Sequence, residues 1–113
     1  MHEMSICESI LSILKEQSRT QGFSRVERVC LEIGPLAGVE IDALEFGFDV
    51  VMRNSLAEGA KLEVHHCPAE AWCMQCAQTV SIKQRYDACS KCGSHQLQVT
   101  SGEELRIKEL EVN

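Results

Sequence analysis

Two pairs of cysteines constrain the fold of this chain more than any other feature. The first pair is Cys73 and Cys76, the second is Cys89 and Cys92, and twelve residues separate the pairs. Two tight turns with this spacing can wrap a single tetrahedral ion, and four thiolates are a ligand set typical of structural zinc. Gly93, directly after the second pair, permits the left-handed backbone conformation that such a turn needs. The sequence therefore predicts a structural zinc site.

The chain has 113 residues, which is more than a zinc module alone requires, so a modest hydrophobic core should accompany the metal site. The stretch from about residue 67 to residue 101 has few large apolar side chains, chiefly Trp72, Val80, Ile82, Tyr86, Leu97 and Val99. Burial of so few side chains cannot offset the conformational entropy lost when the stretch becomes ordered. We therefore expect zinc to act as a folding ligand there.

The charge and the hydropathy pattern exclude several classes of function. The net charge is −6, from 17 acidic and 11 basic residues, and no Lys/Arg cluster could follow a phosphate backbone, so we expect no nucleic-acid partner. No apolar run is long enough to cross a bilayer, and Glu3 and Glu8 interrupt the N-terminal segment, so we expect no membrane association. Seven cysteines, an odd number, fit reduced thiols in a cytoplasmic protein.

Helical and strand periodicities alternate along the first half of the chain. A first amphipathic helix is predicted from apolar residues at helical spacing that end before Gln21-Gly22, namely Met4, Cys7, Ile10, Leu11 and Leu14. A half-buried strand is predicted between Ser24 and Ile33, with Val29, Leu31 and Ile33 on one face. After a loop marked by Gly34-Pro35 and Gly38, a second helix is predicted to end near Arg53, with Ile41, Leu44, Phe48 and Val51 on its apolar side.

The chain is predicted to return to its first domain after the zinc stretch. Leu62 and Val64 mark a strand before that stretch, and Leu105 and Ile107 begin one after it. The apolar positions then slip by one near Lys108-Glu109, which indicates a bulge. The last strand needs neighbours, and the strands around Leu31 and Leu62 are available. The predicted fold is α+β: a small mixed sheet with two helices, formed by residues 1–66 and completed by residues 102–113, plus an inserted zinc-ribbon-like domain at residues 67–101.

The first three residues, Met1, His2 and Glu3, form a second candidate metal site. The α-amine, the peptide nitrogen of His2 and its imidazole Nδ1 can close fused chelate rings on one ion. Such planar nitrogen donors suit Ni(II) or Cu(II). A bulky residue at position 2 favours retention of Met1 and its amine. From these residues alone, an exposed terminal histidine without a metal is the alternative.

Together these features resemble the HypA/HybF family of hydrogenase maturation proteins, and the likeness spans nearly the whole chain. It depends on the two cysteine pairs and on four stretches, Met1-His2-Glu3, Leu31-Glu32-Ile33-Gly34, Gly38-Val39-Glu40 and Leu44-Glu45-Phe46-Gly47-Phe48. The resemblance implies a nickel metallochaperone with a nickel domain built on the N-terminus and a separate structural zinc domain. It also implies two partners, a HypB-like maturation GTPase and the large subunit of [NiFe]-hydrogenase. Short hinges around an inserted domain additionally permit a domain-swapped homodimer.

Other roles for these residues stay open. Glu3 is either a further nickel ligand through its backbone nitrogen, or a residue that orients the site through its carboxylate, or an acid that complements the helix dipole. The residues His65, His66, Cys67 and His95 are either neutral turn residues or auxiliary metal ligands. Cys7 and Cys30 are expected to be small core or strand residues.

An enzyme is not expected. Ile6 occupies the position at which a zinc-protease helix starting with His2-Glu3 would need its second histidine, and the chain has no glycine-rich phosphate loop. Four cysteines also leave zinc no open position for substrate. A different class is still open: a zinc-ribbon interaction module with no role in nickel transfer.

Overall fold

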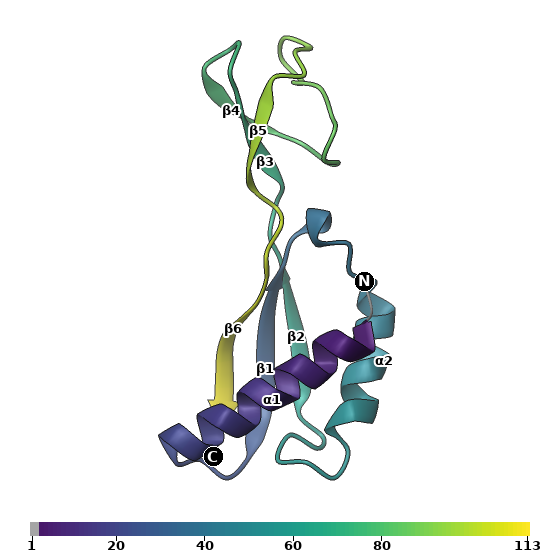
Figure 1. Cartoon of the computed structure of the whole chain (residues 1–113), viewed down its shortest axis with the longest axis vertical. Coiled ribbons are helices and arrows are strands. Elements are labelled where there is room, and N and C mark those ends of the chain that lie inside the picture. The colour runs from purple at the N-terminus through teal and green to yellow at the C-terminus, as the bar shows by residue number, and fades with distance from the viewer. Residues whose placement is uncertain (1–2) are drawn as a thin grey trace. The chain divides into compact units, whose positions relative to one another are not determined.

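A computed structural model of the chain describes residues 3–113, and the chain divides into two compact units. Unit 1 comprises Met1–Leu31, Val39–Val64 and Ile107–Asn113, and unit 2 comprises Glu32–Gly38 and His65–Arg106. The elements of the described residues, in chain order, are α1 (Glu3–Gln21), β1 (Val26–Ile33), the 3-10 helix η1 (Pro35–Ala37), α2 (Ile41–Met52), β2 (Lys61–His66), β3 (Glu70–Cys73), β4 (Gln78–Ser81), β5 (Leu97–Ser101) and β6 (Leu105–Val112) (Figure 1).

The core of unit 1 is built on the packing of α1 against α2. Each helix buries one stripe of apolar side chains, Cys7, Ile10 and Leu14 on α1 and Leu44, Phe48 and Met52 on α2. The helices approach closely at Gly47, where an added Cβ would lie 2.9 Å from Met4 Sδ and 3.4 Å from Cys7 Sγ. Both helices predicted from apolar periodicity are therefore present. The absence of a side chain at Gly47 on α2 leaves room for the side chains of Met4 and Cys7 on α1.

The first sheet has the strand order β2-β1-β6. The C-terminal strand thus lies beside the strand of Leu31, as predicted. Arg28 on β1 forms ion pairs with three carboxylates on the neighbouring strands, Glu63 at 3.0 Å, Glu109 at 3.3 Å and Glu111 at 3.5 Å. This network links β1 to both of its neighbours by side chains as well as by backbone hydrogen bonds.

The sequence indicated that the alternation of side chains along the last strand slips by one residue near Lys108-Glu109. The ion pairs of β6 show where this slip lies. Arg106 Nε lies 2.7 Å from a carboxylate oxygen of Glu32, whereas Glu109 contacts Arg28. Glu32 and Arg28 are four residues apart on β1 and therefore share a face. Arg106 and Glu109 are an odd number of residues apart, so the alternation of β6 must slip between them.

The second sheet lies within unit 2 and has the order β4-β3-β5, with both pairings antiparallel. Its core consists of small and medium-sized side chains, Ala69, Ala71, Cys73, Val80, Ile82 and Cys89, and Leu36, Cys76, Leu97 and Val99 pack against it. Trp72 and Tyr86, which were counted above among the large apolar residues of this stretch, are 39% and 88% exposed. The hydrocarbon core of unit 2 is therefore even smaller than the sequence indicated.

Two glycines of unit 2 allow two distant chain segments to touch through their backbones. A Cβ placed on Gly34 would lie only 2.0 Å from the carbonyl oxygen of Gly102. Hydrogen bonds fix this approach, because Gly34 N donates to Glu104 O at 2.9 Å and Leu36 N donates to Gly102 O at 2.8 Å. Gly102 itself has a φ of +110°, which other residues rarely adopt. The approach holds Leu36 in place against the core of unit 2.

The fold class predicted from the sequence, α+β with a zinc-ribbon-like module, is confirmed. Among residues 3–113, no helix combines the length and the apolar character needed to cross a membrane.

Candidate metal centre

The first cysteine pair lies in a tight turn that follows β3. Cys73 is the last residue of β3, and its carbonyl oxygen accepts a hydrogen bond from Ala77 N at 2.8 Å. The backbone N-H of Cys76 points at Cys73 Sγ, 3.4 Å away. Ala77 closes the turn with a φ of 54°, in the left-handed region that residues with a Cβ seldom occupy. The turn therefore directs both a thiol and an N-H group toward one point.

The second cysteine pair repeats this turn in a loop. Gly93 N donates to the carbonyl oxygen of Cys89 at 2.8 Å, and Gly93 has a φ of 77°. Lys91 N points at Cys89 Sγ at 3.4 Å. In both turns the residue four positions after the first cysteine is left-handed and donates to that cysteine. The left-handed conformation of Gly93 was predicted, whereas that of Ala77 was missed because no sequence signal marks it.

The two turns bring four sulfur atoms together. The Sγ atoms of Cys73, Cys76, Cys89 and Cys92 all lie within 4.8 Å of one another. The distance from Cys73 to Cys92 is 3.7 Å and that from Cys76 to Cys89 is 3.9 Å. A tetrahedral ion with bonds of about 2.3 Å to sulfur requires sulfur atoms about 3.8 Å apart. The spacing thus fits four thiolates around one ion, and it is far too long for disulfides.

Hydrogen bonds shift the pKa values of two of the cluster's thiols, Cys76 and Cys89, in opposite directions. The thiol of Cys92, together with burial and the neighbouring thiols, raises the pKa of Cys76 to about 12. The backbone N-H of Lys91, with help from that of Cys92, lowers the pKa of Cys89 to about 6 against the opposing effect of burial. Cys89 therefore ionises far more readily than Cys76. A bound metal ion has to displace the proton from Cys76, so metal binding releases protons.

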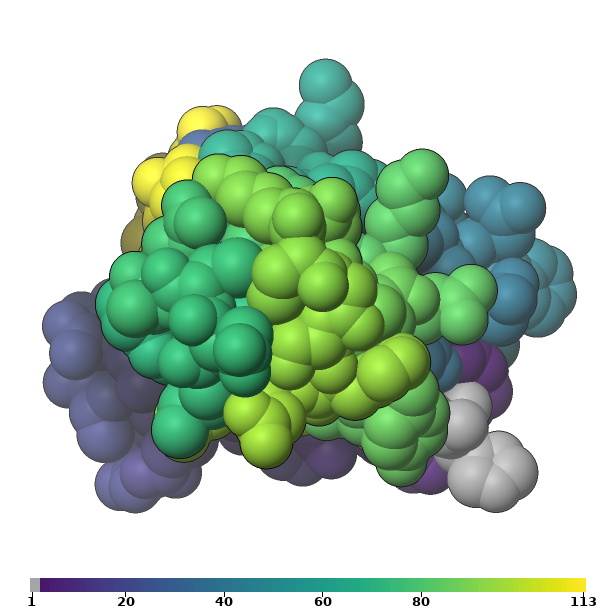
Figure 2. Space-filling model, turned by 90° about the horizontal axis from the view of Figure 1, so that it is seen from above, coloured from purple at the N-terminus to yellow at the C-terminus, as the bar shows by residue number. Residues whose placement is uncertain are grey.

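In unit 2, Figure 2 shows the segment of the first pair, in green, beside the segment of the second pair, in yellow-green. The remaining candidate ligands lie elsewhere. His65 and His66 are exposed at the end of β2, and Cys67 is half buried with its N-H donating to Ile33 O at 2.9 Å. His95 is exposed beyond the second pair. Among residues 3–113, the four cysteines alone form a cluster with metal-ligand spacing.

Two of the cysteines outside the cluster, Cys7 and Cys30, are core residues, as expected. Cys7 and Cys30 are both fully buried. The thiol of Cys7 points at the carbonyl oxygen of Leu44 across the contact between α1 and α2, at 3.5 Å. Burial, and then the nearby carboxylates of Glu3 and Glu8, raise the pKa of Cys7. This thiol is therefore protonated and inaccessible to metal.

The N-terminal candidate site is only partly within the described residues. Met1 and His2 lie outside them. Glu3 is the first residue of α1, and its carboxylate accepts a hydrogen bond from the backbone N-H of Glu40 at 3.1 Å. Glu40 is the N-cap of α2, but its own side chain makes no capping hydrogen bond. Sequence reasoning did not identify this contact, because the two residues are far apart in the chain.

Comparison with known proteins decides the family. The HypA family, described as "Hydrogenase/urease nickel incorporation, metallochaperone, hypA", matches residues 1–112. This chain belongs to the HypA family. The resemblance noted from the sequence is thereby confirmed. HypA proteins are metallochaperones and not enzymes, which agrees with the absence of an enzyme motif.

Curated relatives in the HypA family align with this chain from end to end. The hydrogenase maturation factor HypA of Acidithiobacillus ferrooxidans is 63% identical over 112 residues, which cover 99% of each chain. The protein of the same name from Azotobacter vinelandii is 58% identical over 99% of each chain. The solution structure of the Ni metallochaperone HypA from Helicobacter pylori has a TM-score of 0.71 at 26% identity and covers 99% of this chain and 97% of that one. The fold of the HypA family is thus shared by this chain.

Proposed function

We propose that this chain binds Ni(II) through its first three residues and delivers it during the maturation of [NiFe]-hydrogenase. The observation that carries the proposal is the combination of Met1-His2-Glu3 with membership of a nickel metallochaperone family. The ligands are the α-amine of Met1, and the peptide nitrogen and imidazole of His2, a donor set that suits Ni(II). An ion at a chain terminus can be both held and released, as a carrier requires.

Glu3 contributes to this site in a way that its hydrogen bond indicates. Its carboxylate is engaged with the N-H of Glu40 at 3.1 Å, where α2 begins. The carboxylate therefore positions the start of α1, and the backbone nitrogen of Glu3 is the group that supplies a further ligand to nickel. The proposal thus gives Glu3 two of the roles left open above, orientation through the carboxylate, which its hydrogen bond supports, and ligation through the backbone nitrogen.

The four cysteines hold a resident zinc ion with a structural role. Four sulfur atoms that lie within 4.8 Å of one another, with two of the separations at 3.7 Å and 3.9 Å, fit zinc, which favours closed tetrahedral sulfur sites. With four protein ligands, no position is open for a substrate or for water, so this ion is not transferred. Zinc-ribbon folding and nickel transport are thus separate tasks of residues that are far apart in the chain.

Nickel delivery requires partners, because nitrogen donors alone bind copper more tightly than nickel. The partners are a maturation GTPase of the HypB type and the hydrogenase large subunit, which places the chain in the cytoplasm with reduced thiols. The exposed side of α1 is the contact surface for the GTPase. It carries Ile13, which is 46% exposed, close in sequence to charged residues.

Calorimetric titration of the zinc-loaded chain with Ni(II) tests the nickel site. We compare the wild type with His2→Ala and count the bound zinc before and after each titration. Loss of nickel binding with one zinc retained supports two independent sites. Equal nickel binding in both proteins would exclude the N-terminal site and leave a zinc-ribbon interaction module as the function.

A binding assay with the purified GTPase tests the contact surface. Ile13→Glu should weaken the complex by about tenfold or more, because it places a charge in an apolar contact. Val112→Glu alters an exposed aliphatic residue on β6 and serves as the matched control. Unchanged binding and nickel transfer with Ile13→Glu would refute the assignment of α1.

A further inference from the structure

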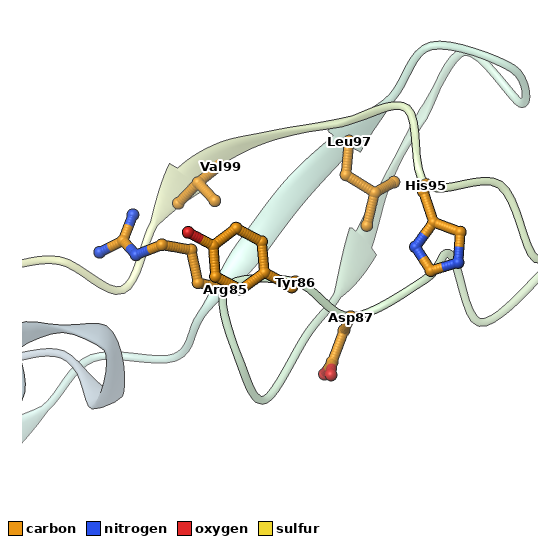
Figure 3. Close-up of a pocket in the computed structure, with 6 residues that line it drawn as sticks. All are labelled: Arg85, Tyr86, Asp87, His95, Leu97 and Val99. Atoms are coloured by element: carbon orange, nitrogen blue, oxygen red, sulfur yellow. The ribbon is translucent and has the colours of Figure 1, made fainter.

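A cavity of about 310 Å³ lies in unit 2, beside β5 and apart from the sulfur cluster. Its lining consists of Arg85, Tyr86, Asp87, His95, Leu97 and Val99. Leu97 and Val99 form an apolar floor, because their register opposite Cys73 and Ala71 fixes them on the core face of the sheet. In Figure 3 both side chains point from β5 toward the loop that carries Tyr86.

Tyr86 is presented to solvent by a rigid turn. Its side chain is 88% exposed, yet the turn around it is closed by three hydrogen bonds. The carboxylate of Asp87 accepts from Lys83 N at 2.8 Å and from Gln84 N at 3.0 Å, and Asp87 N donates to Gln84 O at 3.2 Å. These N-H groups hold the pKa of Asp87 below its usual range. An exposed aromatic side chain on a pre-organised turn binds at a low entropic cost.

The loop beside the cavity is positively charged, in a chain whose net charge is −6. Residues 83–91 contain three basic residues, Lys83, Arg85 and Lys91, and only one carboxylate, that of Asp87, which accepts hydrogen bonds from backbone N-H groups. Even with the Cys89 thiol ionised, the basic residues of the loop outnumber its acids. Arg85 contacts a carboxylate oxygen of Glu103 at 2.5 Å and Leu36 O at 3.3 Å. A guanidinium carries more N-H donors than these two contacts use. The site therefore favours a ligand that brings carboxylates.

β5 is also an edge strand. In the part of the chain that the structure describes, it pairs with β3 alone. An extended segment added to such an edge places alternate side chains on the same face of the sheet. On the core face, those side chains would lie next to Leu97 and Val99, which is where the cavity is.

We infer that this edge docks an extended segment of a partner protein, in which two aliphatic side chains with one residue between them fill the cavity and carboxylates flank them on the same face. In Figure 3 Arg85 lies at the Val99 end of the cavity and His95 at the Leu97 end, so one carboxylate would face Arg85 and the other His95. Tyr86 covers the aliphatic side chains. This surface shares no residue with the nickel site and does not depend on the nickel proposal.

Fluorescence anisotropy with the zinc-loaded full chain tests this inference. The probe is a fluorescein-labelled heptapeptide, Glu-Thr-Val-Thr-Val-Thr-Glu, which puts both valines and both glutamates on one face. We expect binding that weakens about tenfold or more with Tyr86→Ala, since buried aromatic anchors dominate such contacts. Replacing both glutamates of the peptide by lysine should abolish it. Phe46→Ala, which removes an aromatic side chain that is 71% exposed in unit 1, should leave it unchanged.

Four results would overturn the inference. They are the absence of binding at protein concentrations up to about 1 mM, equal binding of the lysine peptide, wild-type affinity in Tyr86→Ala, and an equal loss in Phe46→Ala. Sedimentation provides a further test. If the wild type associates with itself and Tyr86→Ala does not, the segment docked at β5 comes from a second copy of this chain and not from a partner protein.

Discussion

Units 1 and 2 differ in what fills their interiors. In unit 1 the fully buried side chains include large hydrocarbons such as Leu14, Leu44 and Met52, whereas Cys73 is the largest such residue of unit 2 among the described residues. The core of unit 2 is otherwise alanine, cysteine and two β-branched residues. Burial of hydrocarbon contributes about 0.8 kcal/mol per CH₂ group, and alanines supply little of it. One chain thus combines a unit with a large hydrocarbon core and a unit with a small core beside four clustered sulfur atoms.

Removal of zinc should have the largest effect, and on unit 2 alone. Structural zinc contributes about 10–16 kcal/mol of apparent binding energy, which here is folding energy. Chelation, or Cys73→Ser, should therefore unfold the second sheet and leave the amide NMR signals of α1 and α2 in place. The single tryptophan, Trp72 on β3, reports the change by fluorescence. If its emission were unchanged after zinc is lost, the small core would be sufficient by itself.

Leu14→Ala should instead destabilise unit 1 and leave unit 2 and its zinc in place. Leu14 is fully buried in α1, so its truncation should cost about 3 kcal/mol through lost burial and a cavity. Denaturant unfolding followed by the circular dichroism of the helices measures this loss. Ile13→Ala, on the same helix but 46% exposed, should cost less than about 0.5 kcal/mol. Release of zinc by Leu14→Ala would show that the two units do not have separate interiors.

A fall in pH should affect the binding of the two metals differently, and nickel binding should weaken. The amine of Met1 and the imidazole of His2 have reference pKa values of about 7.7–8.0 and about 6.5, and both must lose a proton to bind nickel. Nickel affinity should therefore fall by at least about tenfold between pH 7 and pH 6, and more steeply below about pH 6.5. Calorimetry at each pH, with zinc counted in parallel, measures this. Nickel affinity that does not change with pH would exclude these ligands.

The smallest expected effect is on zinc affinity and comes from exchanging glycine and alanine at the left-handed position of the two cysteine turns. Gly93 and Ala77 occupy the same left-handed position, and an added Cβ on Gly93 meets no atom within 4 Å. Gly93→Ala should therefore weaken zinc binding by the conformational cost alone, about 1 kcal/mol or fivefold, while Ala77→Gly should strengthen it by a similar amount. Competition with a zinc indicator resolves such changes. Shifts of the same sign in both variants would mean that the turns are not equivalent.

The difference between the cores of the two units also explains which parts of the fold could be predicted from the sequence. The helices and strands of unit 1 follow from apolar periodicity, because their buried faces are long and regular. β3, β4 and β5 were not predicted, since they are short and bury alanines and a cysteine while Trp72 stays exposed. The cysteine spacing predicted that four sulfur atoms would meet. It could not predict that Leu36, in what reads as a loop, packs against their core, or that Glu3 contacts Glu40, because both contacts join distant segments.

The backbone contact between Gly34 and Gly102 has a consequence for sequence comparison. Pairs of residues in contact are usually detected because a change in one side chain is compensated by a change in the other. Here the touching atoms are main-chain atoms, and a Cβ on Gly34 would overlap the Gly102 carbonyl whatever residue stood at position 102. No second substitution can restore the fit, so both positions should stay glycine independently. A contact that is essential to unit 2 would then leave no covariation signal in an alignment.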